Sequence, residues 1–120
     1  MYKGTIVGQY IGGVFVTDTE RIIERVDGEH RSVISLQESL KHVRHSPTGF
    51  CWGYCGSGPH QLAFAILFDY LKDKRRVLPM YSEFARKVIS ALPIDAGFEL
   101  PDRTIEDFIT KFDIERMKAN

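Results

Sequence analysis

The chain has 120 residues, of which 43% are hydrophobic and 27% charged, as in ordinary globular domains. Lys and Arg total 16, and so do Asp and Glu, so the formal net charge is zero. This balance lacks the basic excess typical of nucleic-acid-binding domains, so we do not expect a nucleic acid partner. It also gives little electrostatic repulsion between copies, which leaves a homo-oligomer open.

The longest apolar run covers residues 62–68, which is far too short to span a membrane. The N-terminus lacks the charged region and following apolar run of a signal peptide. We therefore expect a cytoplasmic protein with no membrane association, in which Cys51 and Cys55 stay reduced. The length fits a single domain covering residues 1–120.

The N-terminal part of the chain has the pattern of β-strands. β-Branched and aromatic residues fill residues 2–7 and 14–17, on either side of Gly12-Gly13, which predicts a β-hairpin. Residues 22–26 predict a third strand.

That third strand is closed by the turn dipeptide Asp27-Gly28, and residues 33–36 are its predicted partner. Residues 35–44 fit two structures. Ser35 and Glu38 have the spacing of a helix capping box, but the same stretch also fits an extended strand.

The second half of the chain is mainly helical. Residues 50–54 predict a short strand, and Pro59 is suited to the first turn of a helix that runs to about Leu71. This helix is apolar on every side from residue 62 to 68, so we expect it to be buried. Two further helices are predicted over residues 79–92 and from Asp102 onward. The fold class is therefore α+β, with a small N-terminal antiparallel sheet packed against a central apolar helix and two further helices.

The junction between the predicted strand at 50–54 and the central helix is rich in glycine. Helix N-termini carry unpaired N–H groups and partial positive charge, and glycines let a ligand approach the backbone, so this junction predicts an anion or phosphate site. The candidate ligand-binding residues are His45, Trp52, Tyr54, Gly56, Ser57, Gly58, His60 and Gln61. The structural alternative is that the glycines of residues 53–58 only form a tight turn and that Trp52 belongs to the core.

The known motifs for such loops do not fit. Gly53 and Gly58 have the spacing of a Walker A loop, but Pro59 and His60 stand where that loop needs Lys and then Ser or Thr. Gln61 stands at the last glycine of a dinucleotide-binding fingerprint. A nucleophile elbow needs glycines two residues before and two residues after its serine, and Cys55 and Pro59 stand at those places around Ser57.

No metal, cofactor or catalytic set emerges from the remaining residues. The four histidines have no HExxH spacing, and Cys51 and Cys55 lack a second pair at zinc-finger spacing. No nucleophile, base and orienting group stand out together, so we rank an enzyme behind a binding protein.

The stretch HSPTGFCWGYCGSGPHQLA, residues 45–63, resembles the signature of a family of small uncharacterised proteins from bacteria, archaea and phages. That signature is similar to NHSPxGFxWGYGGSGPAQLA, and a weaker likeness covers residues 81–84. The resemblance implies a compact stand-alone domain of unknown function and a phage or mobile-element origin. Arg44, Cys55 and His60 stand where the pattern has Asn, Gly and Ala.

Two functional hypotheses follow. In the first, the chain is a small binding module that holds an anionic or nucleotide-like ligand at the glycine-rich loop and helix N-terminus. In the alternative, it is a phage- or mobile-element-type interaction or inhibitor domain with no small-molecule ligand. It would then bind a protein partner through aromatic residues such as Tyr2, Tyr10, Phe15 and Phe98.

Overall fold

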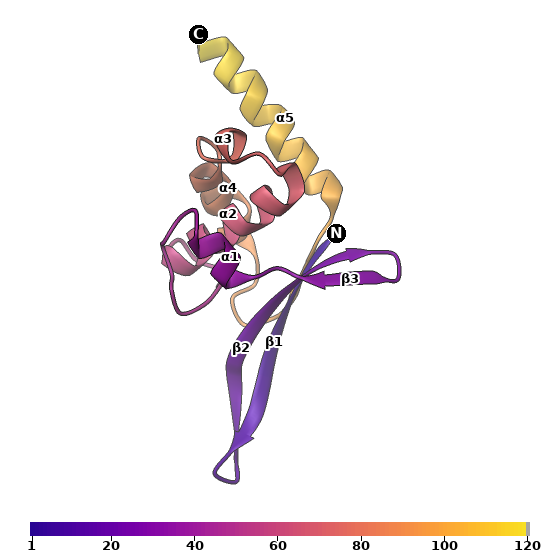
Figure 1. The fold of residues 1–120 in the computed structure, drawn as a ribbon, viewed down its shortest axis with the longest axis vertical. Coiled ribbons are helices and arrows are strands. Elements are labelled where there is room, and N and C mark those ends of the chain that lie inside the picture. The colour runs from indigo at the N-terminus through magenta and orange to yellow at the C-terminus, as the bar shows by residue number, and fades with distance from the viewer. Residues whose placement is uncertain (120) are drawn as a thin grey trace.

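The computed structural model describes residues 1–119 and places a small antiparallel sheet beside a group of helices (Figure 1). The sheet has the strand order β3-β2-β1-β4, with strands β1 (Tyr2–Ile11), β2 (Val14–Asp27), β3 (His30–Val33) and β4 (Phe98–Leu100). The helices are α1 (Leu36–Leu40), α2 (Ser57–Leu71), α3 (Lys74–Val77), α4 (Tyr81–Lys87) and α5 (Asp102–Ala119), with a 3₁₀ turn η1 (Ile89–Ala91). The predicted α+β class is confirmed.

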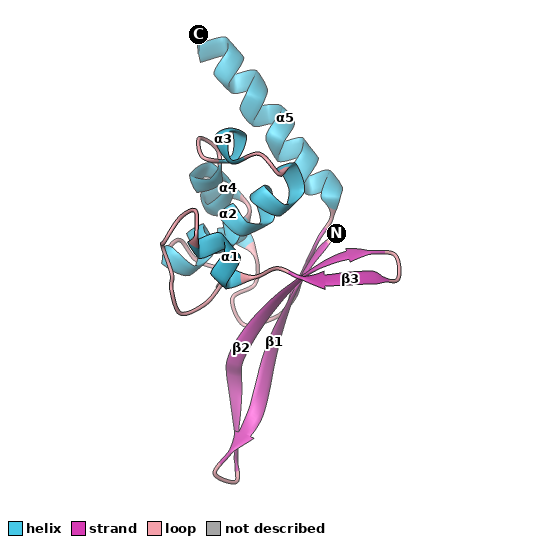
Figure 2. Ribbon diagram, in the orientation of Figure 1, coloured by secondary structure: helices cyan, strands magenta, loops and turns pink. Residues whose placement is uncertain are grey.

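Strands β1 and β2 form a long hairpin that extends beyond the helices as an arm (Figure 2). Its turn is Gly12-Gly13, and both glycines have the positive φ angles that such a turn requires, 58° and 83°. The predicted hairpin is therefore confirmed. Residues 22–26 do form a strand, as predicted, but it is not a separate one. Those residues belong to β2, which runs without interruption from Val14 to Asp27 as one long strand.

The ambiguity over residues 35–44 is resolved in favour of a short helix. Strand β3 ends at Val33, and the Ser35 hydroxyl then accepts a hydrogen bond of 3.1 Å from the Glu38 backbone N–H. This is the N-cap of α1, so the capping spacing was the correct signal. The strand predicted at 33–36 overlaps β3 only at Val33.

The strand predicted at residues 50–54 is wrong, because this segment is irregular. At the base of the sheet, β3 and β4 already occupy the two outer positions. Gly53 has a left-handed φ of 87°, and its N–H donates to the Ile89 carbonyl at 3.0 Å instead of to a strand. The chain passes here from the sheet side of the core to the start of α2.

Helix α2 is the centre of the core, as its sequence predicted. Leu62, Phe64 and Ile66 have no solvent exposure, and the sheet, α4, α5 and the loop before α2 all contribute to the same apolar cluster. The helix ends at Lys72, which has the left-handed conformation of a C-cap. The basic run at 72–76 is therefore not the end of one helix. Asp73 caps a separate helix, α3, by accepting from two backbone N–H groups.

Within residues 1–119, no helix has both the length and the apolar character needed to cross a membrane.

Gly53 fixes the path of the loop into α2, and we predict that Gly53→Ala lowers the free energy of unfolding by about 2–4 kcal/mol. A Cβ at this position would lie 2.4 Å from the Ile94 Cα, and alanine would also be strained by the positive φ. Urea denaturation measures the change. Gly49→Ala is the matched control in the same loop, because a Cβ there meets no atom within 4 Å. Equal stabilities for the two variants would contradict this account.

Candidate functional site

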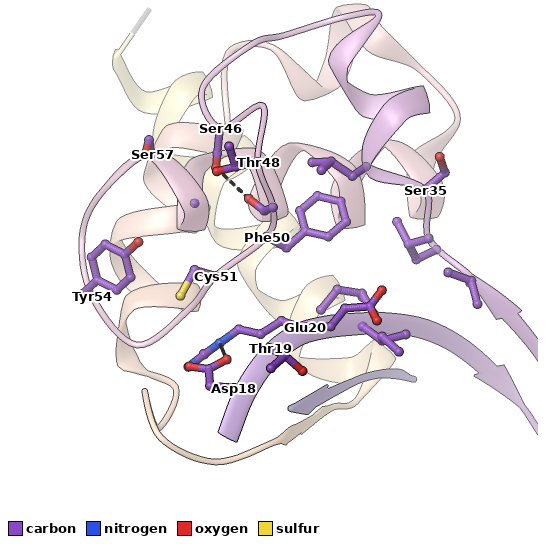
Figure 3. Close-up of a pocket in the computed structure, with 18 residues that line it drawn as sticks. Asp18, Thr19, Glu20, Ser35, Ser46, Thr48, Phe50, Cys51, Tyr54 and Ser57 are labelled. Atoms are coloured by element: carbon purple, nitrogen blue, oxygen red, sulfur yellow. Dashed lines mark hydrogen bonds and ion pairs between the residues drawn. The ribbon is translucent and has the colours of Figure 1, made fainter. Parts of the chain in front are cut away.

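A cleft of about 670 Å³ lies between strand β2 and the loop that leads into helix α2. Its walls come from β2, from the start of α1, from residues 46–51 and from the first turn of α2. Figure 3 shows Tyr54, Cys51 and Asp18 at one end of this cleft, Phe50 in the middle and Ser35 toward the other end. The cleft therefore combines a polar end with an apolar middle.

The first turn of α2 leaves backbone donors free at this cleft. The N-cap residue, Gly56, has no side chain to cap the helix, and the first helical bond runs from the His60 N–H to the Gly56 carbonyl. The N–H groups of Ser57 and Gly58 have no acceptor within residues 1–119, and both residues line the cleft. Such amides, together with the helix dipole, are suited to an anionic group.

Arg21 adds a positive charge to the same cleft. Its side chain is only 10% exposed and lies over the Trp52 ring, with the guanidinium carbon 4.6 Å from the ring centroid. Its Nε and Nη2 donate to the two carboxylate oxygens of Asp18 at 2.9 and 2.7 Å, and Nη2 also donates to the Ile94 carbonyl. Nη1 is buried and has no hydrogen-bond partner within residues 1–119. An unpaired buried donor of this kind is uncommon in folded proteins.

The charges around the cleft are mixed. The hydrogen bonds from Arg21 hold the pKa of Asp18 below its usual value, so this carboxylate is ionised and compensated at neutral pH. Glu20 also lines the cleft and adds a negative charge. Burial raises the pKa of Tyr54, and the neighbouring Cys51 acts in the same direction, so its hydroxyl stays protonated and able to donate.

The structure separates the predicted site residues into three groups. Tyr54, Ser57 and Gly58 line the cleft. Gly56 lies under the Tyr54 ring, so close that a Cβ would be 2.6 Å from a ring carbon. The other four residues do not line the cleft.

Trp52 and Gln61 are fully buried in the core. The Trp52 indole N–H donates to the Ala96 carbonyl at 2.9 Å, and its ring packs edge-on against Phe98, so the ring face is not available for a ligand to stack on. The structural alternative for Trp52 is therefore the correct one.

The Gln61 side chain joins α2 to the segment before the loop through four hydrogen bonds. Its amide oxygen accepts from the backbone N–H groups of His45 and Ser46, at 2.7 and 3.2 Å. Its amide nitrogen donates to the Ser39 hydroxyl and to the Val43 carbonyl, at 2.8 and 3.0 Å. The amide is fully used inside the protein, so its role is structural.

His45 and His60 form a separate cluster with Tyr81. The two imidazole centroids lie 5.4 Å apart, and His45 Nε2 is 2.7 Å from the Tyr81 hydroxyl. His60 Nδ1 lies 2.8 Å from the Gly56 carbonyl, which can only accept, so that nitrogen carries a proton. Within residues 1–119, no group of three or more His, Cys, Asp or Glu side chains is arranged to hold a metal ion.

Sequence reasoning missed Arg21, Asp18 and the hydroxyl and apolar residues contributed by other elements of the cleft. Their place in the site follows from the packing of β2 against the loop, which no local pattern encodes. The one local signal was the run of β-branched residues along β2, and it indicates a strand but not what lies against it.

We predict that Gln61→Met, a substitution of similar length, lowers the free energy of unfolding by about 2–4 kcal/mol, because it leaves buried backbone groups unpaired. Chemical denaturation followed by circular dichroism measures the loss. Gln37→Met is the control, since Gln37 is exposed on α1. A loss no greater than that of the control would show that the four hydrogen bonds contribute little.

We predict that the His45 imidazole titrates below the ordinary histidine pKa of about 6.5. Partial burial of the ring lowers its pKa first, and the neighbouring His60 lowers it further. The unfolded chain then binds more protons near pH 6, so stability falls slightly as the pH drops through this range. Ring proton NMR, assigned with His45→Gln, measures the midpoint. A His45 pKa at or above the ordinary histidine value would contradict the partial burial of this ring beside His60.

Comparison with known proteins identifies one relationship. The model of a family of unknown function, DUF6166, matches residues 10–111, which includes the cleft loop, α2 and most of α5. No curated protein and no solved structure matches the chain. Because the match covers most of its length, the chain belongs to the DUF6166 family of unknown function.

Proposed function

We propose that this protein is a small binding module that holds an anionic or nucleotide-like ligand in the cleft between β2 and the N-terminus of α2. The observation that carries the proposal is the pair of N–H groups at Ser57 and Gly58 that have no acceptor within residues 1–119, on two residues that line this cleft. Arg21 supports it independently, because its Nη1 is a buried charged donor without a partner within residues 1–119.

The lining of the cleft narrows the class of ligand. The Tyr54 hydroxyl lies close to Gly58, where a Cβ would be 3.2 Å from its oxygen, and Ser57 also lines the cleft. Hydroxyl donors of this kind suit the oxygens of a phosphate or carboxylate. Glu20 disfavours a ligand with two separate anionic groups, because the second group would meet its carboxylate. Phe50 offers an apolar surface in the middle of the cleft (Figure 3). We therefore favour a ligand with one anionic group and a partly apolar body.

The test is to titrate the isotopically labelled protein with inorganic phosphate and, separately, with a nucleoside monophosphate. Backbone amide NMR signals are recorded at each addition. Both probes should shift the Ser57 and Gly58 amide signals, with dissociation constants of about 1 mM or lower for the nucleotide. An absence of shifts at these two amides with either probe would overturn the proposal.

Ser57→Asp separates binding from folding. A carboxylate in the first turn of α2 interacts favourably with the helix dipole, so we expect the melting temperature to stay the same or rise slightly. The same carboxylate occupies the free amides and repels an anion, so we expect binding to weaken by about tenfold or more. Ser82→Asp is the matched control, because it adds the same charge to the exposed first turn of α4. Equal binding by the two variants would place the ligand elsewhere.

A second candidate function, a protein-interaction domain, is favoured by the tip of the hairpin arm. Tyr10 and Phe15 are 76% and 52% exposed there, and their rings contact each other with centroids 5.1 Å apart. Ile11, Val14 and Val16 are exposed beside them. Tyr2 and Phe98, by contrast, are buried in the core, so an interaction surface built on them is excluded. A cluster of apolar side chains this exposed marks a surface that is covered in use.

A further inference from the structure

The thiol of Cys51 is the strongest nucleophile in the lining of the cleft. The side chain is partly exposed and is not in a disulfide. Figure 3 shows its sulfur pointing across the cleft toward Asp18 on strand β2, with Tyr54 nearby. The thiol makes a long contact of 3.9 Å with the Trp52 carbonyl, which is a weak hydrogen bond. The sulfur is therefore open to a small molecule that enters the cleft.

Cys51 packs directly against the first turn of α2. A Cβ on Gly58 would lie 2.7 Å from the Cys51 Cβ and 3.1 Å from the Cys51 backbone nitrogen, so glycine lets the helix approach the cysteine. The Ser57 and Gly58 N–H groups, which have no acceptor within residues 1–119, belong to this turn. The cysteine thus lies beside the positive end of the α2 dipole.

Arg21 is a second, independent donor beside the sulfur. Its side chain is nine-tenths buried, and its Nη1 has no partner within residues 1–119. Asp18 accepts from Nε and Nη2, so Nη1 is the guanidinium nitrogen left for a ligand. The Asp18 hydrogen bond raises the pKa of Arg21 most, burial opposes it, and the charges of nearby Cys51 and Tyr54 raise it further. The guanidinium therefore lies within electrostatic reach of the sulfur.

Free donors around a thiol suit a reaction in which negative charge moves from sulfur to oxygen. The thiolate is the reactive form of cysteine, and reactive cysteines lie in electropositive, partly exposed surroundings. Donors that are already in place stabilise the charge as it develops on the oxygen. The Tyr54 hydroxyl, which stays protonated, is a further donor at this end of the cleft.

The lining of the cleft favours oxidation over transfer of an acyl group. Cysteine enzymes that transfer acyl groups pair the thiol with a histidine base. His45 and His60 do not line this cleft, so the thiol has no such partner there. Oxidation by a hydroperoxide needs no paired base, because the leaving oxygen requires only hydrogen-bond donors and a proton.

We propose that Cys51 is a site of oxidation by hydroperoxides, with the free donors of the cleft holding the peroxide oxygens. The ionised sulfur attacks one oxygen of hydrogen peroxide, so an S–O bond forms and the O–O bond breaks. The second oxygen leaves as hydroxide and takes up the proton that the thiol released, which gives water. Sulfur is oxidised by two electrons to a sulfenic acid, and the peroxide is reduced. The reaction uses the donors of the proposed anion site but does not require an anionic ligand.

Cys55 provides the matched control within the same chain. It belongs to the same loop, is more exposed than Cys51 and does not line the cleft. The wild-type protein is treated with hydrogen peroxide in excess dimedone, which traps sulfenic acid, and tandem mass spectrometry assigns the adduct to one cysteine. Exposure alone favours the oxidation of Cys55. We expect Cys51 to be oxidised about tenfold faster, because its surroundings supply the donors. Cys55→Ser should leave the Cys51 rate unchanged.

Ser57→Asp tests the role of the free donors. Its carboxylate occupies the α2 amides and opposes negative charge in the cleft, so the oxidation of Cys51 should slow by about threefold or more. Ser82→Asp adds the same charge to α4 and should leave the rate unchanged. Circular dichroism establishes that both variants are folded. Oxidation of Cys51 no faster than that of Cys55, or equal rates in the two Asp variants, would overturn the proposal.

The two proposals for this cleft fail separately. Cys51→Ser keeps the backbone donors, so phosphate should still shift the Ser57 and Gly58 amide signals in this variant. Rapid oxidation of Cys51 without phosphate-induced shifts would overturn the anion site alone. Shifts with phosphate but slow oxidation of Cys51 would overturn the oxidation site alone.

Discussion

The burial of helix α2 is the constraint on which the rest of this structure depends. The helix is apolar on all sides, so it must be surrounded, and the sheet, α4 and α5 each cover part of it. A single amide, that of Gln61, enters this core with it, and burying the amide is tolerable only because all its hydrogen bonds are made. The same bonds fix the loop that leads into the helix.

The position of the candidate site follows from this burial. The start of α2 must reach the protein surface, and it does so where no side chain is available to cap it. The loop of residues 46–51 and strand β2 then enclose the free amides on either side. The cleft therefore forms because the first turn of this buried helix lies at the protein surface. Its polar groups are mainly backbone amides and Arg21, and not a set of catalytic side chains.

The sequence predicted the features that depend on local physics. Gly12-Gly13 turns a hairpin, Pro59 lies in the first turn of a helix, and the helix from Asp102 forms where its apolar spacing indicated. The sequence did not predict β4, because a pattern over three residues cannot be distinguished from a loop. These residues form a strand only because they pair with β1. Residues 50–54 resemble a strand for the opposite reason: Phe50 and Trp52 are apolar because they are buried in the core, and the backbone at Gly53 turns toward Ile89 instead of pairing with a strand.

The same distinction between local pattern and tertiary packing explains which residues of the candidate site could be predicted from the sequence. The free amides at Ser57 and Gly58 are local, so the glycine and proline pattern was enough to find them. The burial of Trp52 and Gln61 depends on tertiary packing, which the sequence pattern does not encode. The pattern therefore predicts both as ligand-binding residues, although they belong to the core. Arg21 is distant in sequence and reaches the cleft only because β2 packs beside the loop.

The projecting arm also affects how the molecule moves through solution. The chain measures 59 by 31 by 25 Å, and its radius of gyration is 15.0 Å. A compact domain of this length would have a radius of gyration of about 13.6 Å. Hydrodynamic drag follows the longest dimension more than the mass, so a monomer elutes from a sizing column ahead of a sphere of equal mass. Elution volume alone therefore overestimates the number of chains, and stoichiometry for this shape has to come from mass-based methods.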